Sequence, residues 1–88
     1  MVIDYIIIKE DKTPLCFDDN TIIVYGEKQD ALEDLSTTDC GLVEVEYDGD
    51  AATLYFDGEI VGWFEYDTDN EDDYQNKLKE AISMAFMP

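Results

Sequence analysis

The sequence predicts an α+β fold in which a mostly antiparallel sheet of about five strands carries helices packed on one face, in the order β-β-α-β-β-β-α. Three observations lead to this prediction. The Asp-Gly pairs at 48–49 and 57–58 separate three short apolar runs. Apolar residues recur at helical spacing over residues 74–86. A chain of 88 residues that is 45% hydrophobic has the composition of one globular domain, here residues 1–88.

The central segment, residues 42–66, is expected to form a three-stranded meander. Asp-Gly favours two-residue type I′ turns because both central residues need positive φ, and such turns fix the register. They pair Val45 with Ala52, and Ala52 in turn with Trp63. The predicted core face then holds Val43, Val45, Ala52, Leu54, Phe56, Val61 and Trp63. The predicted opposite face holds Glu44, Glu46, Thr53, Tyr55, Ile60, Gly62, Phe64 and Tyr66. The second face mixes acids with aromatics, so it is either solvent-facing or a binding surface.

The first third of the chain predicts two strands and a short helix. Residues 2–9 are nearly all β-branched, aromatic or aliphatic, which indicates a central strand covered on both faces. Residues 21–25 are expected to be its antiparallel partner. Residues 15–17 form an apolar patch in the polar connection between them, suited to brief pairing at a sheet edge. A helix is predicted over residues 27–35.

The last third predicts an amphipathic helix whose apolar residues share one side. These residues are Tyr74, Leu78, Ala81, Ile82, Ala85 and Phe86. Residues 68–70 are expected to cap this helix, with Thr68 and Glu71 as a capping box. The helix is long enough to cover the face that carries Leu54 and Trp63.

The charge of the chain is its strongest functional signal. It has 23 acidic residues, five basic residues and no histidine, which gives a net charge of −18. Repulsion between so many like charges destabilises a compact fold. The magnitude of this net charge also exceeds the value of about 2–8 that keeps a small domain soluble. Adaptation to high salt, solubility and a basic partner are three explanations, and a basic partner is favoured because the core is that of a well-folded domain.

Enzymatic and metal-dependent functions are not expected. Histidine, a nucleophile elbow and a phosphate-binding loop are all missing from the sequence, so no catalytic residue and no cofactor are predicted. Residues 67–73 resemble a calcium loop, but Asp72 stands where glycine is needed and Leu78 where glutamate is needed, so no metal is predicted. Cys16 and Cys40 are expected to be free thiols in a cytoplasmic protein without a membrane span.

The leading hypothesis is a small inhibitor or binding module that occupies the basic cleft of a nucleic-acid-binding protein or nuclease by mimicking nucleic acid. Direct nucleic-acid binding is not expected, because five scattered lysines cannot neutralise phosphates. Carboxylates would steer the partner and aromatics would anchor it. The candidate partner-binding residues are Glu44, Glu46, Asp48, Asp50, Tyr55, Asp57, Glu59, Phe64, Tyr66, Asp67 and Asp69.

In size and charge the chain is similar to small phage and mobile-element inhibitors, such as anti-CRISPR and anti-restriction proteins, and to acidic nuclease-immunity proteins. The similarity is one of composition, and no motif carries it, so no residue roles are transferred. The alternative hypothesis is a non-enzymatic housekeeping or structural domain that self-associates or binds a protein through an exposed aromatic sheet face, with Tyr55, Phe64 and Tyr66 as contacts.

Overall fold

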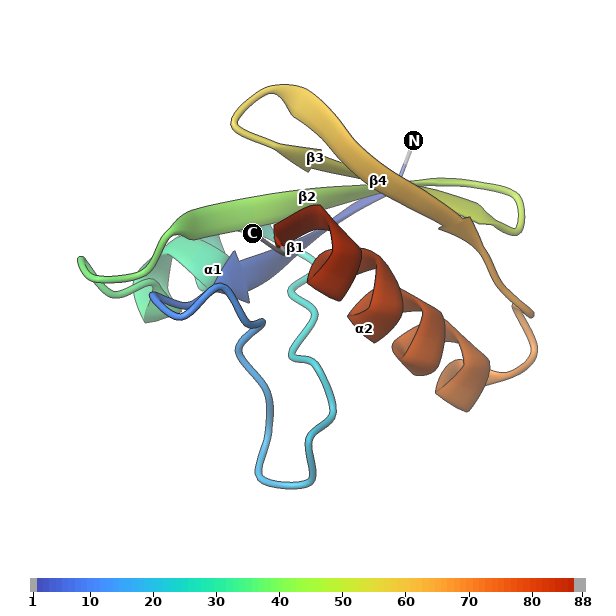
Figure 1. The fold of residues 1–88 in the computed structure, drawn as a ribbon, viewed down its shortest axis with the longest axis horizontal. Helices are drawn as coiled ribbons and strands as arrows, with labels where there is room; N and C mark the ends of the chain where they lie inside the picture. The colour runs from blue at the N-terminus through green and yellow to red at the C-terminus, as the bar shows by residue number, and fades with distance from the viewer. Residues whose placement is uncertain (1, 87–88) are drawn as a thin grey trace.

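The computed structural model describes residues 2–86, which form one antiparallel sheet and two helices. In chain order the elements are β1 (Ile3–Ile8), α1 (Lys28–Asp34), β2 (Gly41–Asp48), β3 (Ala51–Phe56), β4 (Glu59–Glu65) and α2 (Glu71–Phe86). The strands lie side by side in the order β1-β2-β3-β4, and α2 crosses one side of the sheet (Figure 1). The α+β class is therefore confirmed, whereas the predicted number of about five strands is wrong by one.

The missing strand is residues 21–25, which form isolated bridges in place of a ladder. The amide of Phe17 donates to the Thr21 carbonyl at 2.9 Å and that of Ile23 to the Leu15 carbonyl at 3.0 Å, so the brief pairing predicted for residues 15–17 is confirmed. Tyr25 makes an isolated antiparallel bridge with Tyr5, so the predicted neighbour is right, but the pairing is not sustained. The backbone groups of Ile22 are instead hydrogen-bonded by the side-chain amide of Gln75 on α2, with N–O distances of 2.9 and 3.2 Å. A side chain thus satisfies polar groups that a neighbouring strand would otherwise bind.

The first hairpin turns one residue later than predicted. Asp48 pairs with Ala51, so the loop is Gly49-Asp50, and Gly49 has a φ of +62° at the first loop position. Glycine at that position is typical of a type II′ turn. The shift changes each cross-strand partner by two residues, and because side chains alternate, the predicted faces of β2 and β3 are unchanged.

The second hairpin follows the prediction at its turn and departs from it further along β4. Asp57 and Gly58 both have positive φ, as a type I′ turn requires. A register shift at Leu54/Tyr55 then adds one residue to β4. From there on, the faces of β4 are exchanged relative to the prediction.

The exchange corrects three assignments on β4. Phe64 is buried with 7% exposure in the core, while Trp63 is 65% exposed on the other face. Gly62 also faces the core, against Leu54 and the backbone of Ala81 on α2, so it leaves no dip on the outer surface.

The main core lies between the sheet and α2. Leu78 and Ile82 of α2 are buried with Val43, Val45, Leu54 and other residues of the strands, and Tyr74, Ala81 and Phe86 pack around them. The predicted apolar stripe of this helix is therefore confirmed, although it covers Leu54 and not Trp63.

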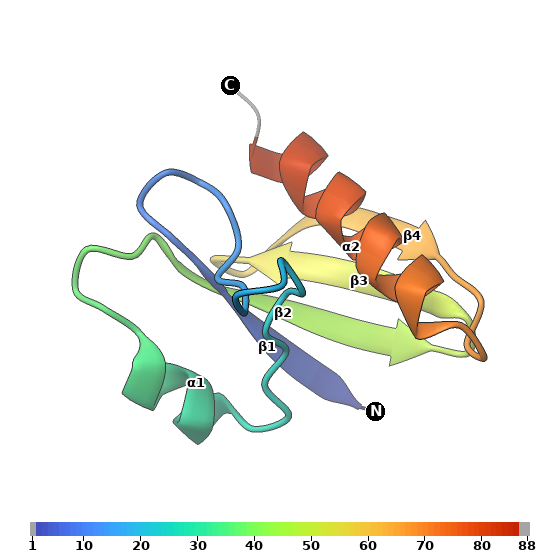
Figure 2. The ribbon, with the colours of Figure 1, turned by 90° about the horizontal axis from the view of Figure 1, so that it is seen from below.

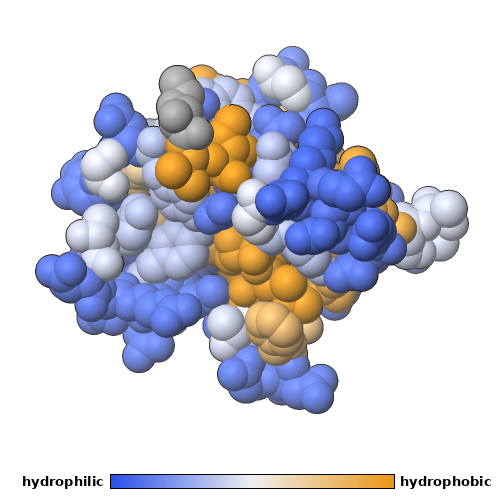
Figure 3. Space-filling model, turned by 180° about the vertical axis from the view of Figure 1, so that it is seen from behind, coloured by the Kyte–Doolittle hydropathy of each residue, from blue (hydrophilic) through white to orange (hydrophobic). Residues whose placement is uncertain are grey.

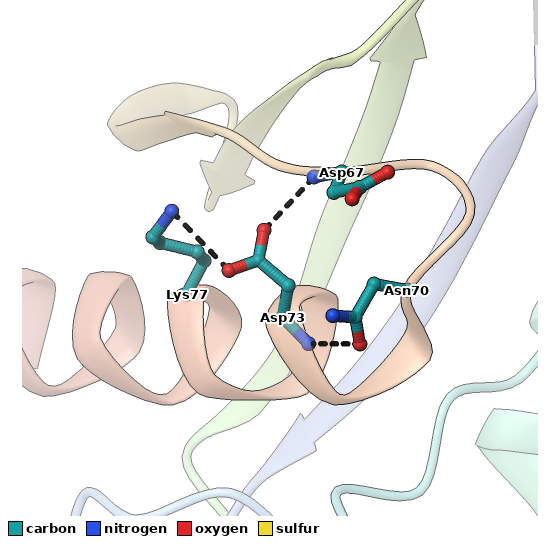
Figure 4. A network of polar contacts seen from close by, with 4 residues as sticks. All are labelled: Asp67, Asn70, Asp73 and Lys77. Atoms are coloured by element: carbon teal, nitrogen blue, oxygen red, sulfur yellow. Dashed lines mark hydrogen bonds and ion pairs between the residues drawn. The ribbon is translucent and has the colours of Figure 1, made fainter.

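The cap of α2 lies within the predicted residues 68–70, but it does not use the predicted capping box of Thr68 and Glu71. The amide of Asp73 donates to Asn70 Oδ1 at 3.1 Å, and the Asp73 carboxylate accepts from the amide of Asp67 at 2.8 Å (Figure 4). Lys77 adds an ion pair with Asp73 at 3.5 Å (Figure 4). Asn70 thus caps the helix in place of Thr68, but the pair is not a capping box, because Asp73 accepts from the amide of Asp67 and the amide of Asn70 donates to the Asp67 carbonyl.

α2 packs across the sheet against β4, whereas α1 packs at β1 and lies beside that edge of the sheet, apart from α2 (Figure 2). The prediction that both helices pack on one face is therefore wrong. α1 packs on β1, where Ile7 and Ala31 are fully buried outside the main core. Ile6 and Ile8, on either side of Ile7 in the strand, belong to the main core. The predicted burial of the first strand on both faces is thereby confirmed, although β1 is an edge strand and not a central one.

Candidate functional site

The side of the sheet that faces away from α2 is here called the outer face. α1 contacts the sheet at β1, and within residues 2–86 no helix packs on the β3 and β4 part of the outer face. The register places Glu46, Thr53 and Trp63 in one row across β2, β3 and β4. The neighbouring row holds Glu44, Tyr55 and Ile60.

Two large apolar side chains on this face are exposed. Trp63 is 65% exposed and Ile60 is 64% exposed, with the half-buried Tyr55 and Thr53 beside them on β3. Aromatic side chains with this exposure are typical of the anchoring residues of protein interfaces. The strand β4 that carries them is also the last strand of the sheet, so its outer edge is unpaired within residues 2–86.

Carboxylates flank these apolar side chains. Glu44 and Glu46 lie on β2, and Glu65 lies on β4 beyond Trp63. Alternate residues on one face of a strand repeat about every 6.8 Å, so Glu44, Glu46 and Asp48 form an evenly spaced acidic row. An apolar centre with an acidic border is suited to a partner whose surface is apolar at one point and basic around it.

A groove lies at one end of the outer face. It has a volume of about 460 Å³, and its lining includes Leu42, Glu44 and Tyr55 of the sheet together with Lys28 of α1. The predicted residue Asp57 lines it as well, from the β3–β4 turn. The groove gives the otherwise open face a concave region beside Glu44.

The predicted site residues do not form one continuous strip. Glu44, Glu46 and Tyr55 lie together on the outer face. Asp48 and Asp50 are exposed at the β2–β3 end of the sheet, where the amide of Tyr66 donates to the Asp50 carbonyl. Asp67 and Asp69 follow in the loop before α2, and Asp57 and Glu59 lie at the opposite end, around the β3–β4 turn.

Two predicted anchors, Phe64 and Tyr66, lie on the inner side of the sheet. With Tyr47 and Tyr74 they form an aromatic cluster whose neighbouring ring centroids are 5.0–6.3 Å apart. Burial raises the pKa of Tyr74 to about 12, and it also raises the pKa of Tyr66 and Tyr47. The hydroxyl groups of Tyr47 and Tyr74 contact each other. These rings stabilise the fold and are not available as outer-face anchors.

Negative charge is not confined to one side of the molecule. Exposed acidic residues also lie in the 18–19 turn, on α1 and in the first turn of α2. The view from behind shows hydrophilic residues around much of the border and apolar residues between them (Figure 3). A row of carboxylates alone therefore does not distinguish one region of this surface from another, whereas the adjacent exposed Trp63 and Ile60 do distinguish the outer face.

Residues 2–86 contain no group of three acidic, cysteine or histidine side chains arranged to hold a metal ion. In the same range, no helix has the length and apolar character needed to cross a membrane. Cys16 and Cys40 are free thiols, as predicted.

Trp63 and Ile60 were missing from the predicted site. Ile60 lies on the predicted face but is not among the predicted contacts, and the sequence predicts Trp63 for the core. Glycine inside a strand is a known signal for a bulge, so Gly62 was the one feature of the sequence that indicated a change of face next to Trp63.

Comparisons with known proteins give this site no precedent. No protein-family model matches the chain, and neither the curated proteins nor the solved structures compared with it include a match.

Proposed function

We propose that this protein is a non-enzymatic binding module that occupies the basic, nucleic-acid-binding cleft of a partner protein. The observation that supports this most directly is the exposed Trp63 and Ile60 between the carboxylates of Glu44, Glu46 and Glu65. The net charge of −18 accelerates encounter with a cationic surface, and apolar contacts at the centre then slow dissociation. Inhibition follows because the cleft cannot hold nucleic acid at the same time.

A first experiment identifies the partner. The immobilised protein is incubated with nuclease-treated bacterial lysate, eluted with a salt gradient, and the retained proteins are identified by mass spectrometry. The affinity for the partner should weaken as the salt concentration rises, because salt screens the attraction between the exposed carboxylates and basic groups. At physiological ionic strength the screening length is about 8 Å.

The decisive measurement is competition. We expect the purified partner to lose nucleic-acid binding in proportion to the amount of this protein added. The variant Glu44→Lys/Glu46→Lys should abolish that competition. The control variant Glu33→Lys/Glu80→Lys makes the same charge change at exposed positions on α1 and α2 and should retain it. Equal effects of both pairs would contradict a specific role for the outer face.

Self-association through the same surface is a second candidate, favoured by the unpaired edge of β4 next to Trp63. Two copies of this chain repel each other, so raising the salt concentration should strengthen a dimer and weaken a complex with a basic partner. Sedimentation of the purified protein at low and high salt separates these two candidates.

A further inference from the structure

A second hollow on the molecule has a local charge opposite to that of the whole chain. It lies between the connection that follows β1 and the C-terminal half of α2, with a volume of about 820 Å³. Three of the five lysines line it: Lys9, Lys12 and Lys79. Asp11 is the one acidic residue in its lining. We refer to this hollow as the lysine-lined cleft.

The three ammonium groups are weakly compensated. Within residues 2–86 one lysine–carboxylate ion pair is present, between Lys77 and Asp73, and it does not involve a lysine of the cleft. Lys12 donates to Cys40 Sγ at 3.3 Å, and a thiol sulfur is a weak acceptor. The Asp11 carboxylate accepts from the amide and the hydroxyl of Thr13. These hydrogen bonds lower the pKa of Asp11, with a smaller contribution from Lys9, and hydrogen bonds to Thr21 lower the pKa of Asp19, with a smaller contribution from Lys79. The two carboxylates are therefore near these lysines, but neither pair is in ion-pair contact among the described residues. The three ammonium groups therefore keep the capacity to bind an external anion.

The remainder of the lining is largely apolar. It includes Leu15 and Phe17 on one wall, and Ile82 and Phe86 of α2 on the other. Phe17 is 58% exposed, so the protein core does not account for its position. Pockets of about 300–1,000 Å³ with apolar walls and a few polar groups are typical of small-molecule sites.

We propose that the lysine-lined cleft binds a fatty carboxylate, a singly charged anion with an apolar body. The lysines are placed to bind the carboxylate, and the phenylalanine and aliphatic side chains to cover the chain. A polyphosphate is disfavoured because repulsion from a protein of charge −18 grows in proportion to the charge of the ligand. This site is independent of the proposed function, since its lining shares no residue with the outer face.

Titration calorimetry with dodecanoate below its micelle concentration tests the proposal. We expect saturable binding of one molecule per chain. Acetate lacks the apolar body and dodecan-1-ol lacks the charge, so each should bind at least about tenfold more weakly. Undetectable binding of dodecanoate, or equal binding of dodecan-1-ol, would overturn the proposal.

A matched pair of variants on α2 tests the location of the site. Lys79→Gln removes a cleft lysine and should weaken dodecanoate binding by about tenfold. Lys77→Gln makes the same charge change two residues away, outside the cleft lining, and should leave the affinity within about twofold. Phe17→Ser changes an exposed position on the other wall of the cleft and should also weaken dodecanoate binding. It tests the site without relying on the Lys79 variant, whose substitution could affect folding. Equal affinities of all three variants and the unmodified protein would place the ligand elsewhere.

Discussion

The two faces of the sheet are built from the same strands, yet they differ in what covers them. On the inner face, Val45 and Leu54 are fully buried beneath α2. On the outer face, the large hydrophobic residues Trp63 and Ile60 are 65% and 64% exposed. Burial on the inner face supplies most of the apolar packing of the fold, whereas Trp63 and Ile60 add little to it and are accessible to another molecule. This difference separates substitutions that unfold the protein from those that affect only binding.

The largest expected effect is on the inner face. Leu54→Ala should lower the free energy of unfolding by about 2–5 kcal/mol, because it opens a cavity between β3 and α2. The total free energy of unfolding of a domain is only about 5–15 kcal/mol, so this substitution would remove much of its stability. Urea denaturation followed by circular dichroism measures the change. A loss below about 1 kcal/mol would mean that α2 does not close over the sheet as described.

The matching substitution on the outer face should separate binding from stability. Trp63→Ala is expected to change the free energy of unfolding by less than about 1 kcal/mol. It should weaken binding to the basic partner by about 2 kcal/mol or more, which is roughly 30-fold in affinity. The control is Met84→Ala, which removes an exposed apolar side chain of α2 and should leave binding unchanged. Unaltered binding of the Trp63 variant would remove the outer face as the interface.

The contrast between the faces was only partly predictable from the sequence. The Asp-Gly turns and the helical spacing of Tyr74, Leu78 and Ile82 depend on local chemistry, and both were recovered. The bulge in β4 depends on how the strand packs under α2, and periodicity alone does not indicate it. A single added residue exchanged Trp63 and Phe64 between the faces, and it moved two predicted anchors into the core.

The first third of the chain shows a second limit of prediction from the sequence. The run of Ile6, Ile7 and Ile8 correctly predicted a strand covered on both sides, which already required a cover on the side away from α2. The prediction of helices on one face did not use that requirement, and α1 supplies the cover. The contact between Gln75 and Ile22 joins residues 53 positions apart, so no local pattern could have indicated that a helix side chain binds the backbone groups of Ile22 that face away from residues 15–17.

Alkaline pH should weaken the inner face through its tyrosines. Burial raises the pKa of Tyr74 to about 12, above the ordinary value of 10.0, and raises that of Tyr47 in the same direction. The unfolded chain therefore loses these protons first, so stability is complete below pH 10 and falls as the pH rises toward 12, by up to about 1.4 kcal/mol per pH unit for each tyrosine.

Thermal denaturation between pH 8 and pH 11.5 measures this loss, and absorbance at alkaline pH follows tyrosine ionisation. Tyr74→Phe removes one of the ionising groups, so its melting temperature should fall less steeply with pH than that of the unmodified protein. The same slope in both proteins would show that Tyr74 is not protected from ionisation in the folded state.

The smallest expected effect is at the first turn of α2, the helix that distinguishes the inner face from the outer one. Asn70→Ala removes the acceptor for the amide of Asp73 and should cost about 1 kcal/mol of stability. Asn76→Ala makes the same chemical change at an exposed position inside the helix, where alanine is the better helix former, and should be neutral or slightly stabilising. Because the cap lies away from Trp63, the Asn70 variant should bind the partner normally while it remains folded. A loss of affinity as large as that expected for Trp63→Ala would show that the loop before α2, with Asp67 and Asp69, belongs to the interface.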